Sequence, residues 1–447
     1  MGATSLLDKL TTNNEPFWLK EFRSNAFKAF ENSKPERTEL FKHQSLFNDF
    51  DLEEFGSADG DKTELNFNLT DDVVFSLQTS NEVEINLPKD LKEKGIIVAK
   101  LDNNIKNDNQ FKQILISDSK LDDKFMHMND ALFNSGLFIY IPKNVQLEVP
   151  FRIISNVNSH LISKTIIIVD QDSILKVVKE DYSLYSDKPI LFSDSMHVLL
   201  RDSAELHFSH IQNLSHNVVH VTNKISTCHK NSRIYWNTGY FGGKKVRSRV
   251  YSLLLGEGSE GEDLEVLFGN KEQQFDLFSD LLHTGKNTSG RVLANGVLLD
   301  KSNVILKGMI KISEFAKNSN SFLGQHGMLL SRDAKAKAIP GLEIETNEVK
   351  ATHSASVSQI EEDKIFYLMS RGLSELQSKK MIASGFFEPA IRQMYFDEVK
   401  NKISYLIELK WEGKEEEFLK HLDEFKVDKD EEVRKETDLF AGHYKYR

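Results

Sequence analysis

Three short stretches with the same layout decide the fold, namely residues 172–177 (DSILKV), 202–208 (DSAELHF) and 231–236 (NSRIYW). Each begins with Asp or Asn followed by Ser, a pair typical of tight turns, and continues as a short strand. The three serines are 30 and 29 residues apart. Weaker copies follow at residues 258–259, 301–302 and 333–334. A nearly constant step of this length predicts a β-solenoid, in which each coil buries its apolar face against the previous one.

The sequence on both sides of these turns supports a long strand region. Residues 63–69 and 82–87 alternate between apolar and polar side chains, and residues 137–141 form a continuous apolar run of strand length. Residues 103–134 are a possible helical interruption. The eight prolines leave the interval between Pro189 and Pro340 free, as expected where backbone N–H groups form a ladder. A β-sandwich or barrel is the alternative, but neither favours a turn repeat of about 30 residues.

Both ends of the chain change to helical periodicity. Pro16 precedes a run whose phenylalanines recur on one helical face, and apolar residues recur at helical spacing over 361–383 and 388–410. The charged stretch 412–436 is expected to be a solvated helix or a frayed end. We therefore predict a helical N-terminal domain (residues 1–62), a β-helix core (63–358) and a helical C-terminal domain (359–447).

Composition excludes several classes of protein. A formal net charge of −11 makes a general nucleic-acid partner improbable, because phosphate binding needs a basic surface. No apolar run approaches the ~20 residues of a membrane span, and the first residues lack the apolar core of a signal peptide. The single cysteine, Cys228, can neither form an internal disulfide nor hold an iron–sulfur cluster alone. We expect a cytoplasmic protein.

Four groups of residues could carry chemistry. His353 stands just before the helical tail and could ligate iron through a ring nitrogen, although a structural histidine is the commoner case. Glu343 and Glu345 would share one face of a strand and could bind a cation, although such pairs are usually plain surface. We expect Cys228 to be an inert buried thiol. The histidines 207, 210, 216, 220 and 229 match no zinc spacing, although His216 and His220 would share a face of a strand or helix.

Nucleotide chemistry has no support in the sequence. Residues 242–245 (GGKK) do not complete a phosphate loop, which needs Gly-x4-Gly-Lys-Ser/Thr before a helix. No Gly-x-Gly-x-x-Gly motif follows a strand either. We expect that the chain is not an enzyme.

Three sets of residues together resemble the SufB/SufD family of iron–sulfur cluster assembly proteins. The first is 338–345 (AIPGLEIE), 349–353 (VKATH) and 365–372 (IFYLMSRG). The second is 128–136 (MNDALFNSG) with 138–143 (FIYIPK). The third comprises His283, Ser289, Gly296 and Gly308, in the family's order and approximate spacing. The resemblance covers most of residues 15–395.

The resemblance implies a right-handed parallel β-helix core between helical domains, which agrees with the periodicity. It also implies that two core subunits pair through their β-helices and that each C-terminal domain docks on an ABC-type ATPase, SufC. A transient iron–sulfur cluster would be shared with the partner, and a flavin is possible in the complex. His353 matches the family histidine at the SufB–SufD interface. The docking residues implied by the match are Ile365, Phe366, Tyr367, Leu368, Arg371, Gly372 and Phe386.

Details favour the SufD-like member of the family. SufB-like chains tend to carry Glu on each side of the matched histidine, whereas Thr352 and Ser354 stand here. SufD chains often have Cys two residues before it, where this chain has Ala351. A SufB-like or self-pairing scaffold is the alternative within the family. A β-helix carbohydrate-active enzyme such as a polysaccharide lyase is less favoured, because it is usually exported and needs convergent acid/base groups.

Overall fold

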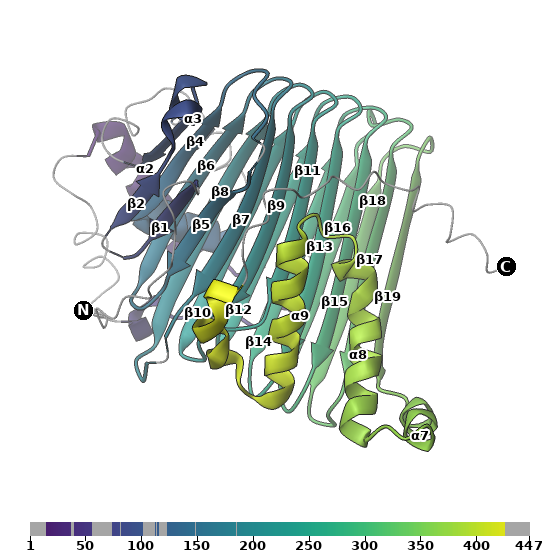
Figure 1. The fold of residues 1–447 in the computed structure, drawn as a ribbon. Coiled ribbons are helices and arrows are strands. Elements are labelled where there is room, and N and C mark those ends of the chain that lie inside the picture. The colour runs from purple at the N-terminus through teal and green to yellow at the C-terminus, as the bar shows by residue number, and fades with distance from the viewer. Residues whose placement is uncertain are drawn as a thin grey trace.

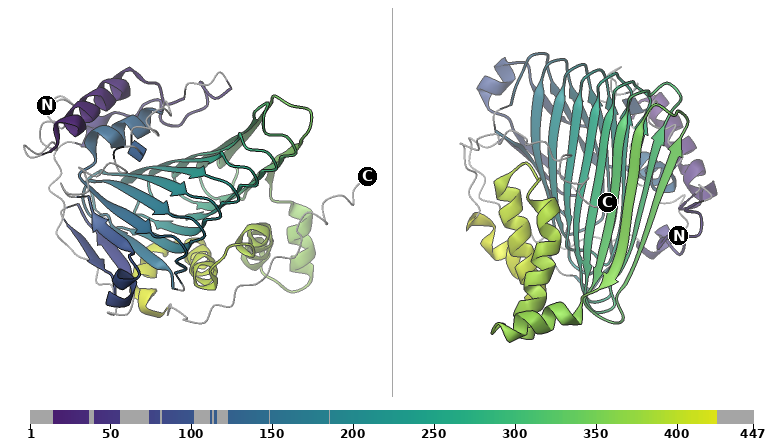
Figure 2. Two further views of the ribbon diagram at one scale, coloured as in Figure 1. Left: turned by 90° about the horizontal axis from the view of Figure 1, so that it is seen from above. Right: turned by 90° about the vertical axis from the view of Figure 1, so that its right-hand side faces the viewer.

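The chain folds into a β-solenoid flanked by helices (Figure 1). In this computed structural model the described residues are 15–36, 40–55, 74–80, 82–101, 112, 114–115, 123–147, 149–184 and 186–424. Within these ranges the strands form one sheet of ten and one of nine, which face each other across a common interior (Figure 2). We call this interior the lumen. The expected solenoid is confirmed.

The first sheet has the order β19-β17-β15-β13-β11-β9-β7-β5-β1-β2. Its strands are β1 (Phe75–Gln78), β2 (Val83–Asn86), β5 (Phe151–Asn156), β7 (Ile174–Tyr182), β9 (Glu205–Asn213), β11 (Arg233–Tyr240), β13 (Glu260–Gly269), β15 (Ser289–Leu298), β17 (Asn320–Leu329) and β19 (Lys350–Gln359).

The second sheet has the order β18-β16-β14-β12-β10-β8-β6-β4-β3. Its strands are β3 (Ile97–Lys100), β4 (Ser135–Ile141), β6 (Leu161–Val169), β8 (Ile190–Leu200), β10 (Val218–Cys228), β12 (Lys245–Leu254), β14 (Gln274–His283), β16 (Asn303–Ile312) and β18 (Lys335–Ile344). All neighbours pair in parallel except β1 with β2 and β3 with β4.

The register explains the sequence repeat. A series of paired residues runs across the first sheet from Ile174 through Glu205 and Arg233 to Lys350. Successive members of this series are 27 to 31 residues apart, which is the length of one coil. Before β7, β9 and β11 the chain turns through a residue with positive φ, respectively Asp172, Ser203 and Asn231. Asn and Asp tolerate this left-handed conformation better than most residues.

Two of the weaker turn copies do not belong to this series. Residues 301–302 and 333–334 precede β16 and β18, so they turn at the other edge of the solenoid. The next equivalent turns are at Asn287 and Asn318, both with positive φ. The longer step of 43 residues between Ser259 and Ser302 in the sequence repeat is therefore a change of edge. The predicted strand at 63–69 lies outside the described residues.

Apolar side chains that point inward fill much of the lumen. They include Leu206, Phe208 and Trp236, and Trp236 is the largest fully buried side chain. The indole N–H of Trp236 donates to Ser252 Oγ at 3.2 Å, so burying the ring leaves no donor unpaired. Pro340 lies in β18, the edge strand of its sheet, where a missing N–H interrupts no inner ladder.

The N-terminal helices cover the outer face of the second sheet. Helix α2 (Phe17–Asn32) confirms the helix expected after Pro16, and within 103–134 the structure places α6 (Lys124–Leu132), which contacts β6, β8 and β10. The amide of Asn129 in α6 donates to Ser163 O and to Ser193 Oγ, both at 3.0 Å. The family-like stretch 128–136 therefore fixes the helix to the sheet. The short elements η1 (Leu52–Phe55) and α3 (Lys89–Glu93) complete this end.

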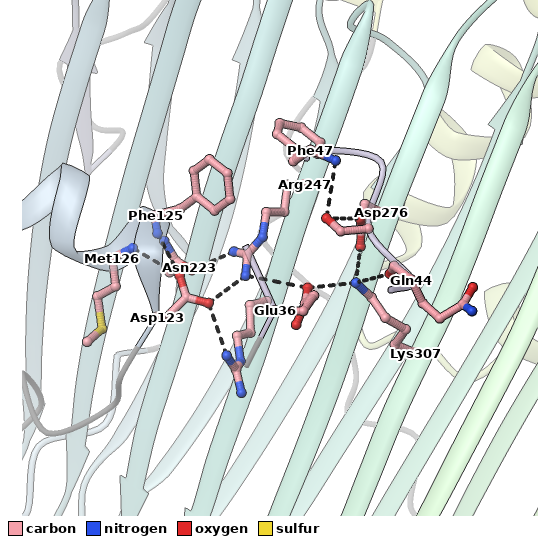
Figure 3. A network of polar contacts seen from close by, with 12 residues as sticks. Glu36, Gln44, Phe47, Asp123, Phe125, Met126, Asn223, Arg247, Asp276 and Lys307 are labelled. Carbon is pink, nitrogen blue, oxygen red and sulfur yellow. Dashed lines mark hydrogen bonds and ion pairs between the residues drawn. The ribbon is translucent and has the colours of Figure 1, made fainter. Parts of the chain in front are cut away.

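A buried ionic network fastens the segment after α2 to the same face (Figure 3). The Lys307 ammonium on β16 lies 2.7 Å from Glu36 Oε1, 2.5 Å from Asp276 Oδ1 and 3.0 Å from Gln44 O. Arg247 on β12 pairs with the Asp123 carboxylate at 2.5 Å. The network thus joins residues far apart in sequence.

The C-terminal helices differ in their bounds from the prediction. The region expected as one helix over 361–383 contains α7 (Glu362–Ser370) and the start of α8 (Glu375–Ile391), separated at Gly372, whose φ is +94°. Ser374 then caps α8 through a capping box. Helix α9 (Asp397–Glu412) and η2 (Glu415–Glu424) follow, and residues 425–447 lie outside the described ranges.

Helices α8 and α9 pack on the outer face of the first sheet (Figures 1 and 2). Their buried side chains, including Phe387, Ile403 and Leu406, join sheet residues such as Phe268 and Leu264 in one apolar cluster. These helices are therefore part of the fold of the β-body. In the part of the chain that the structure describes, no helix is both long and apolar enough to span a membrane.

Candidate functional site

His353 lies on the last strand of the first sheet. It pairs in register with Leu323 of β17, a fully buried lumen residue. Parallel in-register partners point to the same face, so His353 points to the lumen side at the open end of the solenoid. The side chain is exposed because no further coil covers it. Thr352 and Ser354 alternate to the opposite face.

The strand that carries His353 is an open edge. β19 ends the first sheet and β18 ends the second, and among the described residues neither has a strand on its outer side. Residues 352–359 are all exposed. Such an edge presents unpaired backbone N–H and C=O groups and is a template for pairing with another chain.

Glu343 and Glu345 do not join His353. The Lys311 ammonium lies 2.6 Å from Glu343 Oε1 and 3.4 Å from Glu345 Oε1. Glu343 alternates with the lumen-facing Leu342, so this pair lies on the outer face of the second sheet. The cation that the two carboxylates hold here is a lysine of the same chain.

The histidines between 207 and 229 separate into different environments. His216 lies in the turn before β10, where Nε2 meets Glu415 Oε1 at 2.9 Å. His220 lies inside the lumen, with Nε2 2.7 Å from Asp194 Oδ1. The expectation that His216 and His220 share a face is wrong, because β10 begins only at Val218. His210 also points into the lumen, whereas His207 stacks on Tyr235 and contacts the tilted ring of Tyr395 outside it.

Cys228 is fully buried at the end of β10. Burial raises the pKa of its thiol to about 12, so almost no thiolate is present at neutral pH. The predicted inert thiol agrees with this environment.

His283 and the glycines matched with it are packed inside the coils. His283 Nδ1 is 2.8 Å from Thr288 Oγ1 and Nε2 is 3.0 Å from Ser321 Oγ. Burial lowers the pKa of His283 to about 4, which keeps the ring neutral. A Cβ on Gly308 would lie 2.8 Å from the buried Leu323 side chain, which would have to shift to make room for it. This part of the family motif is structural.

The C-terminal helices expose an apolar surface. Phe366 is 74% exposed and Tyr367 57% exposed on α7. The Arg371 guanidinium lies 5.2 Å from the centre of the Tyr367 ring. The other exposed apolar side chains are Met369 on α7 and Leu376 and Met381 on α8. Exposed apolar side chains gathered on neighbouring elements are typical of protein interfaces.

The remaining predicted docking residues are buried to different degrees. Ile365 is only 8% exposed, and with Leu329 and Ile360 it lines a cleft of about 340 Å³ between α7 and the end of the solenoid. Leu368 and Phe386 are half-buried, and Gly372 is exposed. Asn295 Nδ2 donates to Phe386 O at 2.8 Å, which fixes α8 to β15.

The sequence did not reveal one polar cluster. Lys179 and Asp181 on β7 meet Asp194 on β8, together with His210 and His220, inside the lumen. These residues come from coils about 30 positions apart, so spacing could not show that they meet. A usable signal was the run of three consecutive charged residues, 179–181, inside a strand that the turn repeat predicts.

Comparison with known proteins gives consistent matches. Residues 151–386 match the profile of the SufBD core domain, described as SUF system FeS cluster assembly. Iron–sulfur cluster assembly SufBD family proteins from Staphylococcus haemolyticus and Staphylococcus epidermidis are each 30% identical over 344 residues. A SufBD family protein from Staphylococcus aureus has the same identity. Each match covers 76% of this chain and 74% of the relative.

Proposed function

Because this chain belongs to the SufBD family of iron–sulfur cluster assembly proteins, we propose that it is a non-catalytic, SufD-like scaffold subunit. It pairs with a SufB-like paralogue, docks a SufC-type ATPase and supports iron entry into a nascent cluster. The exposed position of His353 on an open strand edge carries this proposal. The cluster is transient and shared with the partner, and any flavin belongs to the complex.

The choice of SufD over SufB rests on what surrounds His353. Its neighbours Thr352 and Ser354 are weak ligands, and Ala351 stands where a thiol would be expected. The one thiol, Cys228, is fully buried in the lumen. A SufB-like sulfur acceptor needs an accessible thiolate, so this chain is better suited to contribute an imidazole.

The two exposed regions suit two different partners. The β18–β19 edge can continue its sheets with the edge of a second β-helix, which would bring His353 to the junction. The apolar surface of α7 and α8 suits the ATPase. The absence of an internal disulfide fits the reducing cytoplasm, where we place the assembly.

Replacing His353 by alanine should lower the cluster yield of the assembled complex roughly tenfold, because a ligand at the junction is lost. Folding and assembly should change little, because substituting an exposed side chain usually changes the free energy of unfolding by less than about 0.5 kcal/mol. Cluster content per assembled complex is read from the visible absorption and from iron and sulfide analysis. The melting temperature of the same sample is measured in parallel.

His229→Ala is the matched control, because His229 is a partly exposed histidine in a turn several coils from β19. It should retain the full cluster yield. Normal cluster content in the His353 variant would remove His353 from the site. Normal cluster content together with a lower melting temperature would identify it as a structural histidine.

A further inference from the structure

The lumen contains a cluster of metal-ligand side chains several coils away from His353. It consists of Lys179 and Asp181 on β7, Asp194 on β8, His210 on β9 and His220 on β10. All five side chains are at least nine-tenths buried. The proposed role of His353 does not involve them.

The donor atoms converge. One ligand atom from each of Asp181, Asp194 and His220 can be chosen so that all lie within 4.8 Å of one another. His220 Nε2 is 2.7 Å from Asp194 Oδ1, and His210 Nε2 is 2.6 Å from Asp181 Oδ2. Carboxylate oxygens combined with imidazole nitrogen are the donors that divalent first-row transition metals prefer in the absence of thiolate.

The charges around the cluster favour an additional cation. In the lumen four carboxylates are buried together with two ammonium groups, which belong to Lys179 and Lys224. The carboxylates are those of Asp181, Asp194, Asp263 and Glu265, and the Lys224 ammonium interacts electrostatically with the last three. Burying unbalanced charge is costly. Burial accordingly raises the pKa of Asp263 to about 6 and that of Glu265 to about 8. Protonation is one way to reduce the excess negative charge, and a divalent cation is another.

One lysine already occupies the position of a cation. Lys179 Nζ lies 2.5 Å from both oxygens of Asp181, 3.4 Å from Asp194 Oδ2 and 3.4 Å from His210 Nε2. The two carboxylates and the imidazole therefore already surround a positive charge.

We propose that Asp181, Asp194 and His220 bind one divalent transition-metal ion, such as Zn²⁺ or Fe²⁺, which displaces the Lys179 ammonium. The His210 imidazole keeps its hydrogen bond to Asp181 and orients that carboxylate, as residues behind metal ligands do. This site is independent of the SufD-like role and of the cluster at the subunit junction.

Cobalt(II) is the probe, because its visible absorption reports an N/O ligand set. The full-length chain is treated with a chelator and titrated with Co²⁺, both in the folded state and during refolding from urea. We expect one equivalent to bind with visible d–d bands and to be displaced by Zn²⁺. Asp194→Asn and His220→Gln should weaken binding roughly 100-fold, because each removes a ligand. His353→Ala should bind Co²⁺ like the unaltered chain.

Lys179→Met is a second test, which still applies if the ligand variants fail to fold. Without metal it should melt at a lower temperature, because two buried carboxylates lose their cation. It should bind Co²⁺ at least tenfold more tightly than the unaltered chain, and Co²⁺ should raise its melting temperature more. Failure of the unaltered chain to bind Co²⁺ under either condition would overturn the proposal. Equal affinity of the unaltered chain and Lys179→Met, or loss of the bands in His353→Ala, would also overturn it.

Discussion

Replacing Phe366 and Tyr367 together by alanine should weaken binding of the SufC-type ATPase by roughly 100-fold or more. Exposed aromatic anchors at an interface commonly contribute about 2 kcal/mol each, and 100-fold corresponds to ~2.7 kcal/mol. Phe366 is 74% exposed and Tyr367 57% exposed, so their truncation leaves no cavity in the protein. Isothermal titration calorimetry with the purified ATPase measures the effect.

Phe315→Ala is the control for this pair. Phe315 is 67% exposed, and its turn follows β16 at the edge of the solenoid opposite to the one where β19 leads into α7. ATPase affinity should therefore be unchanged in this variant. An unchanged affinity in the Phe366/Tyr367 double variant would show that α7 is not the docking surface.

Point variants are preferable to deleting the helical tail. Helices α8 and α9 bury the outer face of the first sheet, including Phe268 and Leu264. Deleting residues 361–447 would expose this face to water, so that misfolding and lost docking could not be separated. The tail thus belongs to the stable body and also carries the proposed docking surface.

Lys307→Met should destabilise the protein by about 3–5 kcal/mol. The methionine keeps the volume of the side chain but removes the only ammonium that contacts both Glu36 and Asp276 in the described part of the chain. Breaking a buried ion pair by removing one partner leaves uncompensated charge, which is the costly case. The shift of the urea midpoint at constant m gives the change in unfolding free energy.

Lys311→Met is the matched control, because Lys311 lies four residues further along β16 and pairs with Glu343 and Glu345 at the surface. Exposed pairs contribute at most about 1 kcal/mol. If the two variants lose similar stability, the network in Figure 3 does not hold the N-terminal segment.

The solenoid could be predicted because its signal is local. Asp172 and Asn231 mark turns that need positive φ, and the strands that follow alternate regularly. The confusion of the two turn edges arose because a serine closes the turn at both edges. The hydroxyls of Ser232 and Ser302 each donate to the carbonyl oxygen three residues earlier. The helix bounds in the tail were also wrong, because α8 continues through Pro389 to Ile391, whereas the second helix was expected to begin at residue 388.

Of the candidate functional residues, only one that a sequence motif identifies by itself could be predicted. His353 could be named from its motif, and its exposed place on the edge strand suits the interface role the motif implies. The lumen cluster could not be found, because Asp181 and His220 approach one another only after two neighbouring coils have stacked. The sequence likewise could not show that Lys311 lies between Glu343 and Glu345, because this contact joins two different strands that lie side by side only in the folded sheet.

The most direct test of the account is co-expression of this chain with the SufB-like paralogue and the SufC-type ATPase, followed by native mass spectrometry of the purified material. We predict one assembly that contains this chain, the paralogue and the ATPase together, with this chain paired to the paralogue through β18 and β19. The SufD-like role would be contradicted if this chain were found only as a monomer or homodimer while the paralogue and the ATPase assembled without it.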